Sequence, residues 1–218
     1  MLSITEENHL KAIFHLSSDG NKDVSTNGIA DSLKTKAPSV ADMLKKLSEK
    51  KLVSYKKYQG SFLTEDGRKT ALNIIRKHRL WEVFLVNKLN FNWDEVHDIA
   101  EQLEHIKSEK LINELDKFLD YPAKDPHGDP IPNPAGFIKY TTKLVLSDLA
   151  IGETGKLVGI KDSSSTFLKL LDKRKISLGS NIKVLHQEDF DQSIYIGLDE
   201  TNLTISVKSA NNIYVTKI

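Results

Sequence analysis

Apolar residues recur at helical spacing through roughly the first half of the chain. The first helix predicted by this spacing begins near Thr5, with Glu6 and Glu7 in its first turn, and its apolar residues are Leu10, Ile13, Phe14 and Leu16. Ser25 and Thr26 can cap a second helix that runs to Leu33. The pattern therefore starts with two short amphipathic helices.

A third helix follows a four-residue turn at 34–37, and Pro38 suits its first position because proline needs no hydrogen-bond donor there. Its apolar residues are Val40, Met43, Leu44 and Leu47. Residues 52–58 and 61–64 then read as two strands around a turn at Gln59 and Gly60. This order predicts a helix-turn-helix followed by a hairpin wing, and a long helix starts at 64–67.

The apolar pattern changes to short runs in the second half, at residues 156–160, 182–185, 193–197, 203–207 and 213–216, with Gly, Asn and Asp between them. Five of the six prolines lie between Pro122 and Pro134, where each ring removes a backbone donor and restricts its predecessor. We expect a non-helical linker there, and a mainly α fold with a C-terminal all-β domain.

The charge balance, the cysteine count and the lengths of apolar runs exclude several classes of protein. The 218 residues carry 31 Lys and Arg against 30 Asp and Glu, so a nucleic-acid partner must be bound by a local patch rather than by global charge. The absence of cysteine excludes disulfide scaffolds, thiolate zinc sites, iron–sulfur clusters and cysteine nucleophiles. Without a long apolar run or a signal-like N-terminus, the sequence predicts a cytoplasmic protein with no membrane partner.

Positive charge gathers at the third helix and the wing. Eight lysines between Lys34 and Lys57 face only Asp42 and Glu49. In a winged helix-turn-helix, the start of this helix reaches base edges and flanking lysines bind phosphates. The candidate DNA-binding residues are Thr26, Lys36, Ala37, Pro38, Ser39, Asp42, Lys45, Lys56 and Lys57. The alternative is a solvated charged helix face without a partner.

Histidines and carboxylates share helical spacing between residues 78 and 105. His78 and Glu82 are four residues apart on one predicted helix, and the next carries His97, Glu101, Glu104 and His105 at positions i, i+4, i+7 and i+8. Two such helices can build a metal site for Mn(II), Fe(II), Co(II) or Zn(II), and the oxygen-rich set favours Mn(II) and Fe(II). The alternative for each residue is again a solvated helix face.

Catalytic patterns are missing from the sequence. It contains no His-Glu-x-x-His, nucleophile elbow, dinucleotide-binding loop or P-loop, and Gln102 stands where a di-iron carboxylate motif needs glutamate. We therefore expect no enzyme and no small-molecule substrate. The remaining histidines have no informative spacing and are interpreted as surface or structural residues: His9, His15, His127 and His186.

The segments 76–82, 96–105 and 128–132 together resemble the diphtheria toxin repressor family of metal-dependent transcription regulators, which includes iron-dependent regulators and the manganese transport regulator. Residues 146–155 resemble the start of the small SH3-like β-barrel of its longer members and of ferrous-iron transport accessory proteins. The resemblance covers the whole chain. It implies a DNA-binding domain at 1–72, a helical metal-binding and dimerisation domain at 73–140, and the barrel at 141–218.

The resemblance also implies two sets of metal ligands. The ancillary set is His78, Glu82 and His97, and the primary set is Glu101, Glu104, His105 and Asn8. Glu101 stands where iron-responsive members have cysteine, which favours Mn(II) over Fe(II). Asn8 and Lys11 replace two carboxylates of the manganese regulator, which argues against a binuclear site. The barrel ligand positions fall on Ser163 and Thr166, with Asp162 nearby.

These features predict a transcription regulator that controls metal-uptake genes. The resemblance to the family implies that it acts as a repressor. It is expected to bind a palindromic operator as a homodimer when Mn(II) is bound. An Fe(II) sensor of the same architecture is the first alternative, and Zn(II) or Co(II) can substitute in vitro. A metalloenzyme that uses the His and Glu residues is the alternative from another class, and the basic helix and wing argue against it.

Overall fold

The computed structural model describes residues 2–17, 22–56, 60–198 and 201–218. They fold into two compact units. Unit 1 comprises residues 1–81, 100–115 and 131–138, and unit 2 comprises residues 82–99, 116–130 and 139–218. Three of the described helices, at residues 65–89, 96–103 and 109–118, contribute to both units. Within the described ranges, no helix is long and apolar enough to cross a membrane.

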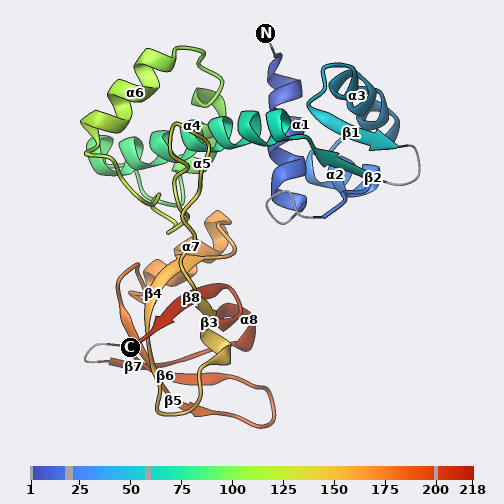
Figure 1. The fold of residues 1–218 in the computed structure, drawn as a ribbon. Helices are drawn as coiled ribbons and strands as arrows, with labels where there is room; N and C mark the ends of the chain where they lie inside the picture. The colour runs from blue at the N-terminus through green and yellow to red at the C-terminus, as the bar shows by residue number, and fades with distance from the viewer. Residues whose placement is uncertain (1, 18–21, 57–59, 199–200) are drawn as a thin grey trace. The chain divides into compact units, whose positions relative to one another are not determined.

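Unit 1 contains the predicted helix-turn-helix and the wing strands, which confirms both (Figure 1). Its elements are α1 (Ile4–Leu16), α2 (Thr26–Ser32), α3 (Ala37–Glu49), β1 (Val53–Lys56) and β2 (Gly60–Leu63). The strands pair antiparallel, with Val53 opposite Leu63. The predicted hairpin turn at Gln59 and the candidate phosphate contact Lys57 lie outside the described residues.

Local capping explains where these helices begin. Ser3, not Thr5, caps α1: the Glu6 amide donates to Ser3 Oγ over 3.3 Å, and the Ser3 amide donates to Glu6 Oε2 over 2.8 Å. Ser25 caps α2 as predicted, because its Oγ accepts the Gly28 amide over 3.0 Å. The helices enclose an apolar core formed by Leu10, Ile13, Phe14, Ile29, Leu44, Leu47, Leu72 and Ile75.

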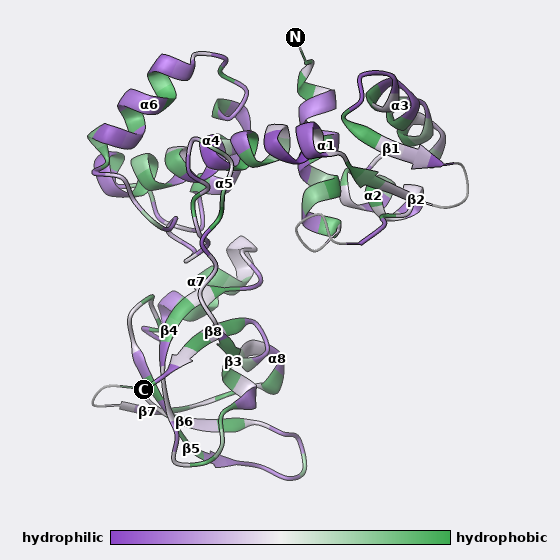
Figure 2. Ribbon diagram, viewed as in Figure 1, coloured by the Kyte–Doolittle hydropathy of each residue, from purple (hydrophilic) through white to green (hydrophobic). Residues whose placement is uncertain are grey.

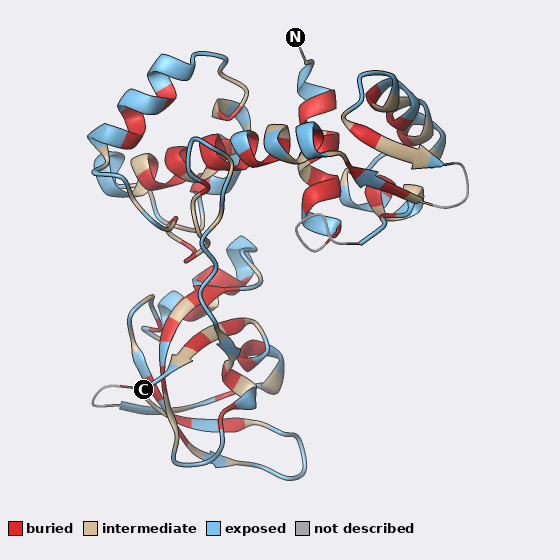
Figure 3. Ribbon diagram, viewed as in Figure 1, coloured by how far each residue is buried: buried red, intermediate tan, exposed pale blue. Residues whose placement is uncertain are grey.

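The long helix α4 (Glu65–Leu89) starts beside this core and is buried along its middle (Figure 3). A Cβ at Gly67 would overlap the Leu52 carbonyl oxygen, so glycine permits this close approach. The helices α5 (Val96–Leu103) and α6 (Glu109–Phe118) follow. Because α5 ends at Leu103, Glu104 and His105 lie in the turn after it, which corrects the expectation that they continue its helical face.

Unit 2 contains the predicted β domain. Among the described residues its strands form one antiparallel sheet in the order β3 (Leu144–Val145), β8 (Ile213–Lys217), β4 (Thr154–Ile160), β5 (Asn181–Gln187), β6 (Ile194–Leu198) and β7 (Thr201–Ile205). Short helical segments interrupt it at η1 (Leu146–Asp148), α7 (Ser165–Lys173) and α8 (Val207–Ala210). The pattern did not predict α7, whose hydrophobic residues are visible in Figure 2 and pack into the domain core.

The proline-rich segment is non-helical, as predicted, but part of it is anchored within unit 2. The Ile160 amide of β4 donates to the His127 carbonyl oxygen over 2.9 Å. Gly128 has a φ of +87°, and a Cβ there would overlap the Val158 carbonyl oxygen. The turn at 125–130 is therefore held against β4 by a backbone approach that requires glycine.

Candidate functional site

Charged side chains from α1, α4 and the end of α5 meet inside unit 1. We call this group the first cluster; its members are Glu7, Lys11, His78, Glu101, Glu104 and His105. The capping box at Ser3 fixes the start of α1, so its next turns bring Glu7 and Lys11 to the same side. The middle of α4 contributes His78, α5 contributes Glu101, and the turn after α5 contributes Glu104 and His105.

Glu104 is the centre of the first cluster. Its side chain is 0% exposed, and it accepts hydrogen bonds from Lys11 Nζ at 2.7 and 2.8 Å. His78 Nδ1 lies 2.6 Å from Glu104 Oε2. Burial raises the pKa of Glu104, but His78 and Lys11 outweigh this effect and hold the pKa below its ordinary value. Glu104 is therefore a buried carboxylate and not part of a solvated helix face, which was the alternative interpretation of the sequence.

A second contact in the cluster joins α1 to the turn after α5. His105 Nδ1 lies 2.6 Å from Glu7 Oε2, and both side chains are largely buried. Asn8 follows Glu7 on α1, and its buried Oδ1 has no hydrogen-bond partner among the described residues. A buried carbonyl oxygen without a partner is costly unless a cation or water binds it. Together with the surrounding carboxylates and imidazoles, Asn8 fits a hard divalent metal ion.

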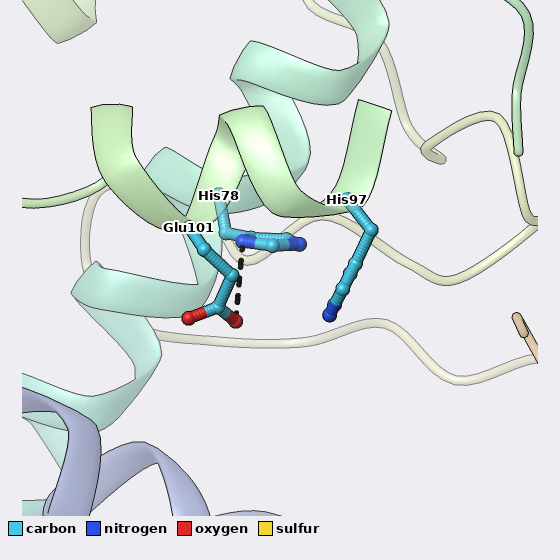
Figure 4. A group of neighbouring side chains, drawn as sticks. All are labelled: His78, His97 and Glu101. Atoms are coloured by element: carbon cyan, nitrogen blue, oxygen red, sulfur yellow. Dashed lines mark ion pairs between the residues drawn. The ribbon is translucent and has the colours of Figure 1, made fainter. Parts of the chain in front are cut away.

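Figure 4 shows His78 on α4 next to Glu101 on α5, with His97 one turn before Glu101 on the same helix. His78 Nδ1 lies 4.0 Å from Glu101 Oε1. Each of the three residues can offer one ligand atom, and these atoms lie within 4.8 Å of one another. The helical spacing that suggested metal ligands in the sequence thus brings imidazole and carboxylate atoms together.

A polar cavity of about 540 Å³ opens beside the first cluster in unit 1. Glu7, Lys77 and Lys107 line it, together with Asn73 and Asn113. Because Glu7 also contacts His105, the cavity gives solvent and ions a route to the cluster. A buried metal site needs such an entry path.

A separate group of titratable side chains lies inside unit 2. We call it the second cluster; its members are Glu82, His97, Asp125 and His127. Glu82 is 2% exposed, with His97 Nδ1 3.5 Å from Oε1 and His127 Nδ1 3.5 Å from Oε2. Ligand atoms of Glu82, Asp125 and His127 lie within 4.8 Å of one another. This arrangement can also hold a divalent ion.

The surrounding structure orients His127. Its Nε2 lies 2.8 Å from the Trp93 carbonyl oxygen, and its ring stacks on the Trp93 indole. This contact directs Nδ1 towards Glu82, as hydrogen bonds to metal-ligating histidines commonly do. Burial lowers the pKa of His127, but the hydrogen bond and charge of Glu82 and the charge of Asp125 raise it to about 9. His127 is therefore a buried site residue and not the surface residue that the sequence allowed.

His78 of the expected ancillary set contacts Glu104 of the expected primary set. Glu82 and His97, also of the ancillary set, lie 3.5 Å apart in the second cluster. Three residues near the clusters were not predicted as ligands: Glu7, Asp125 and His127. The barrel candidate Asp162 instead accepts the Ser164 amide at the start of α7.

The predicted DNA-binding residues lie on the exposed side of α3 and at β1. Lys36, Pro38, Ser39 and Lys56 are exposed, and Ala37 and Thr26 are half-buried. Lys45 Nζ donates to Asp42 Oδ1 over 3.0 Å, and both side chains are highly exposed, so the ion pair contributes little to stability. Lys45 can therefore leave Asp42 and bind a phosphate with little loss of stability.

A winged helix-turn-helix with a basic third helix, joined to buried His and Glu clusters, defines a metal-dependent DNA-binding regulator. Family models match the chain along most of its length. They describe the N-terminal DNA-binding domain of iron-dependent repressors at residues 1–61, their metal-binding and dimerisation domain at 64–133, and a FeoA domain at 144–217. The chain belongs to the diphtheria toxin repressor family of metal-dependent transcriptional repressors, which are not enzymes.

Solved structures and curated relatives agree with this assignment. A manganese-dependent transcriptional repressor in complex with manganese matches with a TM-score of 0.88 and 34% identity, over 98% of this chain and 100% of that one. The iron-dependent repressor IdeR of Mycobacterium bovis is 34% identical over 59% of this chain and 55% of its own length. IdeR of Mycobacterium leprae is 28% identical over 97% of this chain and 87% of its own length. The chain thus spans about half the length of some curated relatives that it matches.

Proposed function

We propose that this protein represses metal-uptake genes by binding a palindromic operator as a homodimer when Mn(II) is bound. The observation that carries the proposal is the first cluster, where three carboxylates and two imidazoles meet at α1 of the DNA-binding domain. The unsatisfied Asn8 oxygen lies on the same helix, next in sequence to Glu7. We assign DNA binding to residues 1–72, metal binding and dimerisation to 73–140, and the barrel to 141–218.

The donor set supports manganese as the metal. We infer that Glu101, Glu104, His105, Glu7 and Asn8 form the primary site, with His78 beside it. Oxygen atoms dominate this set and sulfur is absent, which favours a hard ion such as Mn(II). Fe(II) is the second candidate, because iron-dependent repressors are among the relatives.

We also propose that the second cluster binds a metal ion of its own, through Glu82, Asp125 and His127 with His97 alongside. Three observations support this: the carboxylate of Glu82 is buried, its two oxygens face different histidines, and the Asp125 turn is held rigidly. The Asp125 Oδ1 atom accepts the amides of His127 and Asp129 at 2.8 and 2.9 Å. These two hydrogen bonds fix the position of the Asp125 carboxylate beside Glu82 and His127.

The link between metal and DNA runs through α1 in this proposal. When bound, the metal ion supplies the positive charge that lets the Glu7, Glu101 and Glu104 carboxylates lie together. Glu7 and Asn8 then hold α1 to the turn after α5. Metal can activate DNA binding only through its greater affinity for the DNA-competent arrangement, and typical couplings of this kind change affinity by about 5- to 150-fold.

One titration tests the proposed function directly. Fluorescence anisotropy of a candidate operator duplex, at buffered free Mn(II) and anaerobically at buffered free Fe(II), should show affinity rising with metal and more readily with Mn(II). Gel filtration should give a dimer. DNA binding indifferent to chelator, or a monomer at micromolar concentration with metal, would contradict the proposal.

The DNA-contacting residues should separate into two kinds. Changing Lys45 or Lys56 to alanine should weaken all duplexes alike and flatten the slope of log affinity against log salt by about one unit each, because each lysine displaces counterions at a phosphate. Ser39→Ala should alter base preference at unchanged slope. Anisotropy at several salt concentrations measures both effects, with Lys110→Ala on α6 as the control. An unchanged slope in the Lys56→Ala protein would show that Lys56 of the wing does not contact the DNA backbone.

A further inference from the structure

Lys11 lies where a metal ion would have to bind. From α1, its ammonium contacts Glu101 and donates to both oxygens of Glu104 at 2.7 and 2.8 Å. The Lys11 side chain is only 12% exposed, and Glu104 is fully buried. Neighbouring carboxylates would repel each other strongly in such a low-dielectric place, and the ammonium offsets that repulsion.

The same carboxylate oxygens cannot serve Lys11 and a metal ion together. Glu104 already accepts from Lys11 on both oxygens and faces His78 on one of them. A divalent ion within bonding distance of Glu101 and Glu104 would lie a few ångströms from the ammonium, where two positive charges repel. Binding of metal and the Lys11 contacts therefore exclude each other.

We propose that Lys11 is a tethered competitor for the metal ion, so that its ammonium fills the primary site in the metal-free protein and sets the metal concentration needed for activation. This inference rests on the proposed function, which assigns Glu101 and Glu104 as ligands. Lysine suits the role because its compact charge sits on a flexible four-carbon stem that can move into solvent without unfolding α1.

The competition also changes how α1 is held. In the metal-free protein, Lys11 ties the second turn of α1 to Glu101 and Glu104. In the metal-loaded protein, Lys11 is released, and α1 stays attached through Glu7, one turn earlier, which contacts His105. The release therefore removes one of these two points of attachment along α1.

Lys11→Gln tests the inference, because glutamine keeps a polar side chain and removes the charge. We expect this variant to bind Mn(II) at least about tenfold more tightly by isothermal titration calorimetry, the equivalent of one lost charge-assisted hydrogen bond. We also expect its thermal unfolding in EDTA to occur at a lower temperature than in the wild type, with the difference disappearing in saturating Mn(II). Lys110→Gln, the same change at an exposed position of α6, should match the wild type in both measurements.

Lys11→Arg is the control for a change of side-chain shape, because it keeps the positive charge. Its thermal stability in EDTA should match that of the wild type, and its Mn(II) affinity should lie within about threefold of the wild-type value. Equal or weaker Mn(II) binding by Lys11→Gln, with wild-type binding intact, overturns the competitor role but leaves the proposed function standing. If the wild type binds no Mn(II), both fall. If Lys11→Gln does not fold without metal while Lys11→Arg does, the ammonium is shown to hold the metal-free cluster together.

Discussion

Glu104→Gln is expected to bind operator DNA equally weakly with and without Mn(II), losing the whole metal-dependent gain of about 5- to 150-fold. Glutamine has nearly the same shape, so the fully buried position keeps its volume. The substitution removes the negative charge and replaces one acceptor oxygen with a donor that faces Lys11 and His78. The site then lacks its central anionic ligand.

Anisotropy at buffered Mn(II) measures the effect, and calorimetry tests whether Mn(II) affinity falls in parallel. Glu109→Gln is the matched control, because Glu109 is an exposed glutamate at the start of α6. Far-UV circular dichroism in EDTA establishes that Glu104→Gln is folded. A wild-type response to Mn(II) in folded Glu104→Gln would show that the first cluster is not the activating site.

Helical spacing predicted the parts of the site that lie on single helices. His78 and Glu82 are one turn apart on α4, and His97 and Glu101 are one turn apart on α5, and all four lie in or beside a cluster. The apolar pattern also predicted α1 to α3 and the strands of the β domain, because each element buries one regular face. The spacing of residues in the sequence was therefore sufficient to predict the side chains that lie together on one helix or strand.

The remaining site residues depend on contacts that periodicity cannot reveal. Glu7 meets His105 across 98 positions of sequence, and the spacing within α1 alone gives no reason to choose Glu7 over Asn8. Asp125 and His127 lie in an irregular segment, where the proline pattern predicts only the absence of a helix. The division of His78 and Glu82 between two clusters follows from where α4 passes from one packed unit into the other.

The helix α1 carries both residues of the first cluster and a contact to α3. Glu6 is 1% exposed, and its Oε1 lies 3.2 Å from Lys46 of α3 and accepts at 2.7 Å from Lys50, the C-cap residue of that helix. Burial raises the pKa of Glu6, but these lysines and the Ser3 amide lower it to about 2. Its neighbour Glu7 contacts His105 in the first cluster. Under the proposed function, a shift of α1 on metal binding is passed to α3 through Glu6.

Glu6→Gln is expected to reduce the Mn(II)-dependent gain in operator affinity by about tenfold, within the range of ordinary allosteric couplings, while Mn(II) affinity stays near that of the wild type. Glutamine at this position can still complete the capping box with Ser3, so α1 keeps its start and loses only the ion pairs to Lys46 and Lys50. The gain is the ratio of affinities with and without metal, which cancels any general effect of freeing two lysines near DNA.

Glu49→Gln makes the same charge change at an exposed position of α3 and should leave the ratio unchanged. If both variants show the same ratio as the wild type, the ion pairs of Glu6 do not transmit the metal signal, and the connection between α1 and the DNA must run through the apolar contacts of Leu10, Ile13 and Phe14 instead.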